Sequence, residues 1–373
     1  MQPLQNIKVV SLEQAVAAPS CTRRMVLAGA EVFKIERPEG DFARLYDTAI
    51  AGQSAYFVWL NGGKKSVVLD LRTAQDVAVL RRLIKRCDVL VQNLKPGAMT
   101  KLGLDLAQLH AEQPQLISVS IAGFHPSGPG AQRKAYDLLM QAESGLADIT
   151  GSHHAPGRVG VSVVDLATGM FAYEAILEAL LVRGQTGKGE KIDVALFDAV
   201  AEWMTVPYLL NKYANAAPAR IGLAHPGICP YGVFRAADEV DFVLAIQNEA
   251  EWQRLCQQAL ADQALLDDPR CRDNETRVAN RSFVDEHLQA FFDQRSYPQL
   301  QICLDEADLA FAPLNRVADL QDHVDFRTEP IRVGDIEVEL PVVPGRVKTV
   351  GHTVPLLGQH TDEVRQWLES ADE

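Results

Sequence analysis

Hydrophobic positions in the first 120 residues form short apolar runs that alternate with amphipathic runs of helical spacing. The apolar runs predict buried strands over residues 8–12, 31–36, 66–71, 88–93 and 116–122. The runs between them predict helices over residues 19–28, 73–86 and 98–110. Strands and helices that alternate in this way predict a parallel sheet covered by helices on both faces.

One long helix is predicted in the middle of the chain. Residues 161–183 are mostly apolar, and a strand over 191–196 and a helix over 197–213 follow them. Within the long run, Gly169 is unfavourable for a helix and indicates close packing against a neighbouring helix. Asp165 is also unexpected there, so we consider it a second candidate for chemistry.

The remaining pattern predicts a smaller α+β unit. Residues 215–234 are rich in Ala, Gly and Pro and predict a linker or loop. A strand over 241–246 and helices over 249–260 and 282–292 follow, and a final helix is expected over 361–368. We therefore expect a large α/β domain with a Rossmann-like sheet, formed by residues 1–213 and 330–373, and a small α+β domain within residues 214–329.

Composition narrows the class of protein. The chain has 373 residues, of which 47% are hydrophobic and 23% charged, as expected for a two-domain globular protein. It lacks a run of eighteen apolar residues and a signal segment, so we expect a cytoplasmic protein without a membrane partner. The net charge of −13 argues against a nucleic-acid partner. Six scattered cysteines and the isolated pair His225 and Cys229 do not predict a metal site.

Asp137 is the first candidate for chemistry. It lies between a loop rich in Gly and Pro, residues 122–130, and an apolar-periodic run that begins at Leu138. Two interpretations stay open on this position alone. The carboxylate could cap the helix that follows, or it could act as a nucleophile near loop N–H groups that hold developing negative charge.

Polar and basic side chains gather where the predicted strands end. Ligands of open parallel sheets bind beyond the carboxyl ends of the strands. The side chains there that suit an anionic nucleotide are Lys34, Arg37, Arg44, Asn93, Lys95, Lys101, Arg133 and Lys134. No GxGxxG motif follows the first strand, and GQTGKG at residues 184–189 lacks the spacing of a phosphate loop. The usual dinucleotide-binding fold is therefore disfavoured.

The chain resembles the family III CoA-transferases over nearly its whole length. The matching stretches, in order, are LAGAEVFKIERPEGDFAR, NGGKKSVVLDL, VQNLKPGAMTKLGL, AYDLLMQAESGL, RVGVSVVDLATGMFAYEAILEALLVRGQTGKGEKIDVAL, HPGICPYGVF and LLGQHTDEV. The resemblance implies an interlocked homodimer of two-domain subunits, with Asp137 as the nucleophile. The CoA-binding residues that we expect are Ala15, Val16, Arg37, Asn93, Lys101 and, from the strand ends, Arg133.

The implied reaction moves CoA from an acyl-CoA donor to a small carboxylic acid through an aspartyl anhydride and an aspartyl-CoA thioester. By analogy the donor is succinyl-CoA and the acceptor a dicarboxylic acid such as malate, citramalate, mesaconate or itaconate. CoA thioesters are substrates, and no tightly bound cofactor is required. Relatives specific for formate and oxalate have a glutamine where this chain has Val16, which argues against that substrate pair. Candidates for binding the acid are Arg44, Tyr136 and His225, with Arg133, Arg158 and Arg220 as further possibilities.

Other activities remain open. The sister branch of α-methylacyl-CoA racemases has a His directly before the matching Asp, where this chain has Tyr136. A tyrosine does not titrate near neutrality, which favours CoA transfer over racemisation. Transfer of CoA between the two carboxyls of one acid is a further alternative. So is a non-catalytic CoA-binding protein in which Asp137 only caps a helix.

Overall fold

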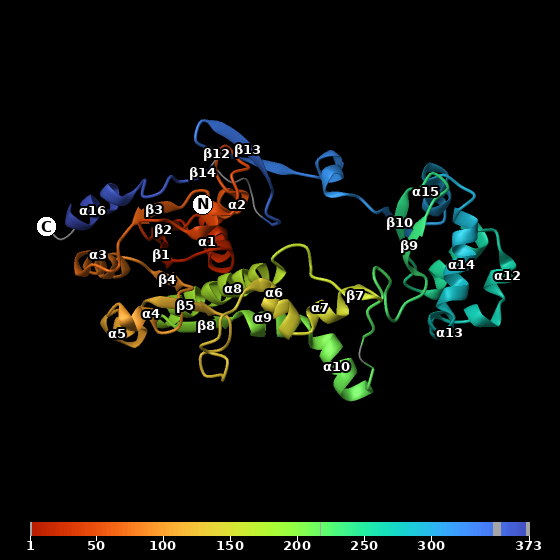
Figure 1. The fold of residues 1–373 in the computed structure, drawn as a ribbon, viewed down its shortest axis with the longest axis horizontal. Coiled ribbons are helices and arrows are strands. Elements are labelled where there is room, and N and C mark those ends of the chain that lie inside the picture. The colour runs from red at the N-terminus through yellow and green to blue at the C-terminus, as the bar shows by residue number, and fades with distance from the viewer. Residues whose placement is uncertain (1, 217, 346–351, 371–373) are drawn as a thin grey trace. The chain divides into compact units, whose positions relative to one another are not determined.

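The chain folds into two compact units, described here from a computed structural model that covers residues 2–216, 218–345 and 352–370 (Figure 1). The large unit comprises Met1–Leu146, Val159–Val206 and Arg327–Glu373, and the small unit comprises Ala147–Arg158 and Pro207–Phe326. The sequence predicts residues 147–158 as part of the large domain. They group with the small unit, where the Arg220 guanidinium donates hydrogen bonds to the main-chain oxygens of Asp148 and Ser152.

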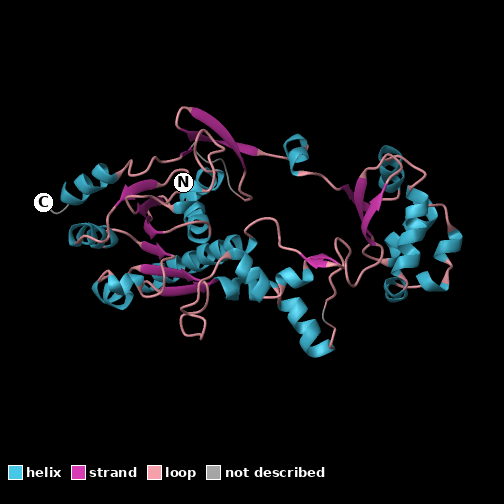
Figure 2. Cartoon of the chain, in the orientation of Figure 1, coloured by secondary structure: helices cyan, strands magenta, loops and turns pink. Residues whose placement is uncertain are grey.

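Six parallel strands form the sheet of the large unit, in the order β3-β2-β1-β4-β5-β8 (Figures 1 and 2). The strands are β1 (Lys8–Leu12), β2 (Glu31–Glu36), β3 (Lys65–Val68), β4 (Val89–Gln92), β5 (Ile117–Ala122) and β8 (Lys191–Ala195). Every neighbouring pair is parallel. The predicted α/β class and the parallel sheet are therefore confirmed.

Helices cover both faces of this sheet. Successive residues of a strand face opposite sides, so Val9 packs into one core cluster and Val10 into the other. The first face carries α1 (Ala17–Leu27), α6 (Asp137–Glu143), α8 (Val163–Thr186) and α9 (Leu196–Trp203). The second face carries α3 (Ala74–Ile84), α4 (Ala98–Lys101), α5 (Leu106–Glu112) and α16 (Thr361–Ser370).

Two helices that the sequence predicts as continuous are each broken in two. Residues 98–110 form α4 and α5, because Gly103 turns the chain with a φ of +69° and the Asp105 carboxylate caps α5. Residues 197–213 form α9 and α10 (Thr205–Ala214), which meet at Met204. The sequence also misses α2 (Ala55–Asn61), a short helix that follows Ser54.

The small unit is an antiparallel sheet with helices. Its strands are β9 (Tyr231–Arg235), β10 (Asp241–Ala245) and β11 (Ala310–Pro313), in the order β11-β10-β9. Its main helices are α11 (Glu249–Arg254), α13 (Asn274–Ala279), α14 (Arg281–Phe292) and α15 (Tyr297–Glu306). Strand β9 lies at the end of the stretch predicted as a linker, so that prediction is wrong for residues 231–234.

Shorter elements complete the two units. In the large unit, β12 (Thr328–Val333), β13 (Ile336–Pro341) and β14 (His352–Thr353) form a third sheet. The remaining short elements are η1 (Phe42–Leu45), α7 (Leu146–Ile149), β6 (Gly151–Ser152), β7 (Ala155–Pro156), η2 (Leu255–Ala259), α12 (Gln263–Leu266), η3 (Pro269–Cys271) and η4 (Val317–Asp322). Among the described residues, no helix has the length and apolar character needed to cross a membrane.

Candidate active site

Asp137 is the first residue of α6, directly after the loop that follows β5. Tyr136 is the extended residue before this helix, with φ −145° and ψ 156°, and no side-chain hydrogen bond caps the helix. The interpretation of Asp137 as the cap of its own helix is therefore wrong. The reason is tertiary, because the carboxylate turns towards a different helix.

The Asp137 carboxylate lies at the N-terminus of α8. Its Oδ1 accepts hydrogen bonds from the main-chain N–H groups of Val164 at 2.8 Å and Asp165 at 3.4 Å. Its Oδ2 accepts a hydrogen bond from Gln141 Nε2 at 2.7 Å. The first N–H groups of a helix have no partner within the helix and favour an anion. Asp137, only 9% exposed, is thus an anion bound at a helix start 27 residues further along the chain.

Gln141 holds this arrangement from the other side. It lies one turn after Asp137 on α6 and is fully buried. Its amide donates to Asp137, and its Oε1 accepts a hydrogen bond from the main-chain N–H of Val159 at 2.9 Å. With both ends of the amide engaged, the Asp137 carboxylate has one favourable orientation.

Asp165 is a second carboxyl in the same place. It lies in the first turn of α8, and its own N–H is one of the donors to Asp137. Burial and the negative charge of Asp137 raise the pKa of Asp165 to about 7. Two carboxyls whose surroundings separate their pKa values are typical of acid, base and nucleophile sites.

Phenol side chains lie near this pair. Burial and the charges of Asp41 and Asp165 raise the pKa of Tyr46 to about 12, so its hydroxyl stays protonated as a hydrogen-bond donor. Tyr46 and Tyr136 remain 48% and 64% exposed. Tyr46 packs edge-on against Tyr56, with ring centroids 5.6 Å apart. The tyrosines beside the acidic pair are therefore accessible to solvent.

Helices α1 and α8 approach closely beside the acidic pair. A Cβ at Gly169 would lie 2.6 Å from the main-chain oxygen of Ala17, a distance that no side chain tolerates. This confirms the close helix packing predicted at Gly169. Gly169 lies one turn after Asp165, so the contact joins the start of α1 to the helix that carries Asp165.

The 14–16 loop, the chain segment directly before α1, is held by side chains from two other segments. Asn93 accepts a hydrogen bond from the Gln14 N–H and donates one to the Gln14 oxygen, each at 2.9 Å. Asp41 Oδ1 accepts a hydrogen bond from the Ala15 N–H at 3.2 Å. Ala15 has a φ of +61°, a left-handed conformation that is unfavourable for residues other than glycine.

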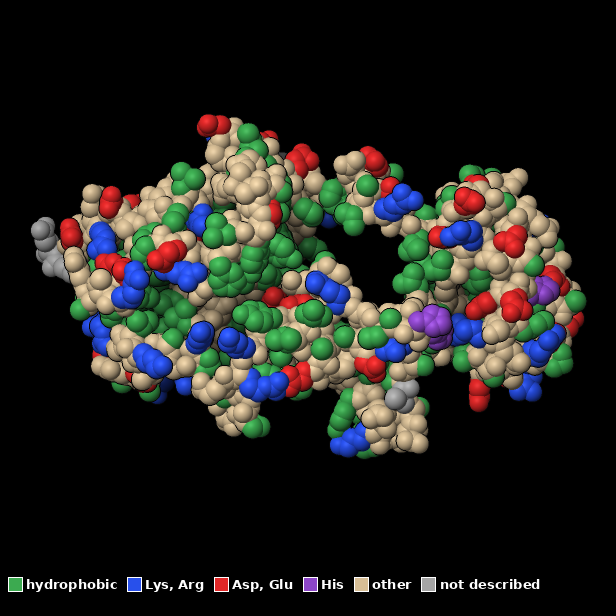
Figure 3. All heavy atoms as spheres, in the orientation of Figure 1, with side chains coloured by type: hydrophobic (Ala, Val, Ile, Leu, Met, Phe, Trp, Pro, Cys, Tyr) green, Lys and Arg blue, Asp and Glu red, His purple; other side chains and the backbone are tan. Residues whose placement is uncertain are grey.

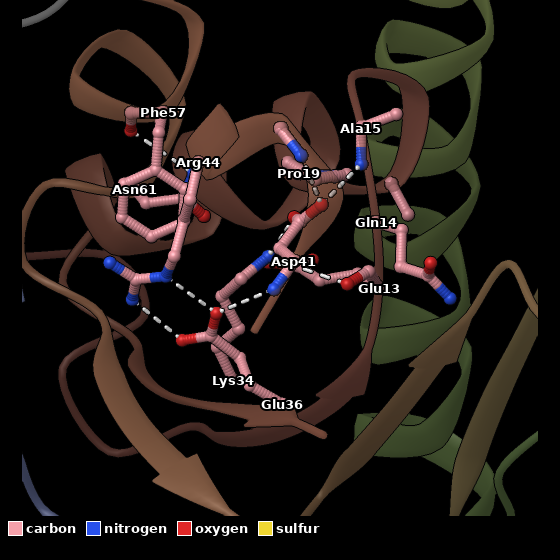
Figure 4. Close-up of polar contacts among 12 residues, drawn as sticks. Glu13, Gln14, Ala15, Pro19, Lys34, Glu36, Asp41, Arg44, Phe57 and Asn61 are labelled. Carbon is pink, nitrogen blue, oxygen red and sulfur yellow. Dashed lines mark hydrogen bonds and ion pairs between the residues drawn. The ribbon is translucent and has the colours of Figure 1, made fainter. Parts of the chain in front are cut away.

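A network of buried charges lies beneath the loop (Figure 4). Lys34 Nζ pairs with Asp41 Oδ2 at 2.8 Å, and Lys64 Nζ pairs with Glu13 Oε1 at 2.6 Å. Burial opposes the charge of Lys34, but the surrounding carboxylates outweigh it and raise its pKa. Burial lowers the pKa of Lys64 to about 8. Lys34, which the sequence suggests as a nucleotide ligand, is instead fully buried inside the protein.

A cavity of about 510 Å³ opens at the carboxyl ends of β1, β2, β3 and β4. Residues that line it include Gln14, Arg37, Asp41, Arg72 and Leu102. Arg37 Nε donates to the Gly40 oxygen at 2.9 Å. This is the edge of the sheet where the sequence predicts a ligand.

Several predicted site residues have their side chains engaged within the protein. Arg44 binds Glu36 through two nitrogens at 2.8 Å and stacks on the ring of Phe57. Arg133 pairs with Glu143 at the surface. His225 stacks on Tyr231 in the small unit, with ring centroids 5.4 Å apart. Lys101 ends α4 directly before the cavity residue Leu102.

Sequence reasoning missed Gln141 and Asp41. The spacing of Gln141, four residues after Asp137 on a helix, is a signal that could have found it. Asp41 gave no such signal, because it resembles an ordinary polar residue in a loop. In the described part of the chain, no group of three His, Cys, Asp or Glu side chains gathers as a metal site would require.

Comparisons with known proteins agree over the whole chain. The sequence profile of CoA-transferase family III matches residues 4–361. The succinate–glutarate CoA-transferase of Agrobacterium fabrum is 33% identical over 99% of this chain and 96% of its own length. The succinyl-CoA:glutarate CoA-transferase of Mus musculus is 32% identical over 100% of this chain and 88% of its own. The acetyl-CoA:oxalate CoA-transferase of Acetobacter aceti is 35% identical over 85% of this chain and 82% of its own length.

Solved structures have the same fold. A CAIB/BAIF family protein from Brucella suis is 32% identical, with a TM-score of 0.84 over 98% of this chain and 99% of its own. Rv3272 from Mycobacterium tuberculosis is 26% identical, with a TM-score of 0.87 over 98% of this chain and 99% of its own.

The raised pKa of Asp165 predicts how its replacement changes stability with pH. The carboxyl titrates near pH 7 when folded and near ~3.9 when unfolded, so the folded state binds more protons between these values. Wild-type stability therefore falls as pH rises through this window, and Asp165→Asn removes that loss. We expect the stabilisation by Asp165→Asn to grow by on the order of 2 kcal/mol from about pH 5 to about pH 8.

Urea unfolding across this pH range measures the difference. Asp105→Asn is the control, because the Asp105 pKa is lowered by backbone hydrogen bonds and its ionisation does not change in this window. A stability difference for Asp165→Asn that is independent of pH would show that the carboxyl is ionised throughout.

Proposed function

Because the chain belongs to CoA-transferase family III, we propose that it moves CoA from succinyl-CoA to a small dicarboxylic acid, with glutarate as the first acceptor to test. The observation that carries this proposal is the pair of carboxyls, Asp137 and Asp165, at the N-terminus of α8. CoA thioesters enter as substrates, and no tightly bound cofactor takes part in the proposed steps.

The contacts favour Asp165 as the nucleophile, whereas the sequence predicts Asp137. Both oxygens of Asp137 accept hydrogen bonds, and the residue is nearly closed off from solvent. Asp165 is half-buried, and no group in the described part of the chain donates a hydrogen bond to its carboxylate. An attacking oxygen needs an electron pair that the substrate can reach. Asp137 as nucleophile stays a prediction that the labelling experiment below tests.

The proposed reaction begins when a carboxylate oxygen attacks the thioester carbon of the donor. The C–S bond breaks, CoA leaves as a thiolate, and a mixed anhydride forms on the enzyme. The thiolate then attacks the aspartyl carbonyl, which releases the donor acid and leaves an aspartyl-CoA thioester. The acceptor carboxylate attacks this thioester, and the released thiolate attacks the acceptor carbonyl of the second anhydride. The product is the acceptor's CoA thioester, and the free aspartate is restored.

Burial and the negative charge of Asp137 together give Asp165 its reactivity in this scheme. A carboxylate with a pKa near 7 is a stronger base than an ordinary one, and about half of it is still ionised at neutral pH. The negative charge of Asp137 is tolerated because the first N–H groups of α8 and the Gln141 amide stabilise it. Asp137 therefore raises the pKa of Asp165 while its own carboxylate stays in one position.

For CoA, we propose that the nucleotide half occupies the 510 Å³ cavity at the strand ends. Arg37 and Arg72 line this cavity and supply positive charge for phosphate groups. Arg72 is paired with Asp70 at the surface, and such exposed pairs contribute little and exchange readily for a ligand. The large unit is then the CoA-binding domain, with the 14–16 loop connected to both the cavity and the helix that carries Asp165.

For the distal carboxylate of the acid, the contacts disfavour Arg44, because Glu36 and Phe57 already occupy its guanidinium. We propose Arg133, whose exposed pair with Glu143 can open, together with the hydroxyl of Tyr136. His225 stays a prediction as a hydrogen-bonding residue of the small unit.

We also propose the interlocked homodimer. Helix α10 buries none of its residues within one chain. Figure 3 shows hydrophobic side chains at the surface of this helix. The exposed large hydrophobic residues on it and beside it are Trp203, Val206, Tyr208, Leu209, Leu210 and Tyr213. A helix with this much exposed apolar surface is typical of an interface. A second copy of the chain would cover it.

Covalent labelling tests the nucleophile. After incubation with succinyl-CoA and trapping with hydroxylamine, we expect peptide mass spectrometry to find a hydroxamate at Asp165. Asp165→Asn should abolish the label, and Asp137→Asn should leave it at Asp165 at a reduced rate. Incubation with free CoA is the control without an activated acyl group. A label at Asp137 that persists in Asp165→Asn would return the nucleophile to Asp137.

The pH dependence of acylation tests the coupling of the pair. The ionised carboxylate attacks, so the single-turnover rate should rise with pH through an apparent pKa near 7. Asp137→Asn removes a like charge and should lower this pKa towards the ordinary carboxyl range. Asp148→Asn, an exposed carboxylate in the small unit, serves as control. An unchanged pKa in Asp137→Asn would contradict the coupling.

Sedimentation tests the dimer. We expect a single species of twice the 41.0 kDa chain mass that persists on dilution to nanomolar concentration, because threaded chains separate only on unfolding. A stable, active monomer would sink the proposed assembly.

A further inference from the structure

We propose that Asp41 is a positioning residue of the CoA site, which fixes the backbone of the 14–16 loop by joining it to the buried network of charges. This inference rests on the proposed CoA-transferase function, since it gives the loop its role in binding the CoA thioester. Nothing in the sequence distinguishes Asp41 from an ordinary loop residue, and its role follows from four contacts.

Asp41 connects three segments through one carboxylate. Its Oδ1 accepts hydrogen bonds from the N–H groups of Ala15 at 3.2 Å and Ala43 at 2.9 Å. Its Oδ2 pairs with Lys34 Nζ at 2.8 Å, and its own N–H donates to Glu36 Oε2 at 3.1 Å. The residue is 2% exposed. The carboxylate therefore ties the 14–16 loop to strand β2 and to the short helix η1.

The loop needs this support because Ala15 has a left-handed backbone. A φ of +61° is unfavourable for alanine, and such a conformation persists where the surroundings enforce it. Asn93 holds Gln14 through two hydrogen bonds, and Asp41 holds the next residue. Figure 4 shows Gln14 and Ala15 next to the ion network, with their side chains directed away from it.

The network under the loop is balanced in charge and nearly closed to solvent, with only Arg44 partly exposed. Its anions are Glu13, Glu36 and Asp41, and its cations are Lys34, Lys64 and Arg44. Buried ions are stable only in such well-paired arrangements, so any displacement of one member is strongly opposed. Because Asp41 belongs to this network and also binds the Ala15 N–H, the network holds the loop in place.

The loop is connected to both parts of the proposed site. Gln14 and Asp41 line the cavity assigned to the nucleotide half of CoA. Ala17, two residues after Ala15, touches Gly169 one turn away from Asp165. A change in the backbone at Ala15 is therefore expected to change how CoA is held in the cavity relative to Asp165, the proposed nucleophile.

Asp41→Asn tests this role with almost no change in volume. In the wild type, Ala15 and Ala43 donate to one oxygen of Asp41 and Lys34 pairs with the other. The single amide oxygen of Asn can take only one of these two positions, and its NH₂ group then faces the donor at the other. The hydrogen bond from the charged Lys34 ammonium is stronger than that from the Ala15 N–H, so we expect the Ala15 hydrogen bond to be lost. We expect the Kd for CoA and the KM for succinyl-CoA to rise about tenfold, with the KM for the acceptor acid and the labelled residue unchanged.

A second substitution separates positioning from stability. Glycine takes a positive φ without strain, so Ala15→Gly in the Asp41→Asn background should recover at least about threefold of the lost CoA affinity. It cannot restore the ion pair with Lys34, so the melting temperature should stay below that of the wild type. Asp105→Asn is the matched control, because Asp105 also caps a helix through two N–H groups but does not contact the loop.

Titration calorimetry with CoA and steady-state kinetics give separate outcomes. If Asp41→Asn does not fold, Asp41→Glu keeps the charge but displaces the acceptor oxygen, and the same CoA-specific loss is expected. Folded Asp41→Asn with wild-type CoA affinity overturns the inference. So does a loss that Ala15→Gly does not relieve, since the role is then structural only. Wild-type protein that fails to bind CoA contradicts the proposed function itself.

Discussion

A carboxylate removed from water needs hydrogen-bond donors or cations around it, and this requirement organises the large unit. It is met in two ways. Asp137 is surrounded by the N–H groups that begin α8 and by the Gln141 amide. Asp41, with Glu13 and Glu36, is surrounded by buried cations. Both arrangements join segments that are distant in sequence, so they fix the position of loops as well as of charges.

The two arrangements meet at the contact between α1 and α8. The missing side chain at Gly169 lets the start of α1 lie against α8, one turn from Asp165. The buried network then sets the loop before α1, while Asp137 sets the electrostatic surroundings of Asp165. Both oxygens of Asp137 accept hydrogen bonds, whereas the pKa of Asp165 lies near 7. This difference separates a fixed carboxylate from one that can act as the proposed nucleophile.

Much of the fold follows from the sequence because it depends on local pattern. Alternating apolar and amphipathic runs predicted the parallel sheet, and Gly169 within a long apolar helix predicted the close approach of a neighbour. Broken helices were missed where a single residue, such as Gly103, turns the chain. Family stretches in their expected order predicted the CoA-transferase family, which the comparisons show directly.

What the sequence alone determined is therefore the class of fold, the family and the presence of an aspartate at a helix start. Only the tertiary structure decided what each charge does. Lys34 and Arg44 resembled free cations for a ligand and are paired inside the protein. Asp137 resembled a free nucleophile, yet its carboxylate is bound at a helix 27 residues away. Burial and pairing depend on which segments meet in space, and no periodicity along the chain encodes those meetings.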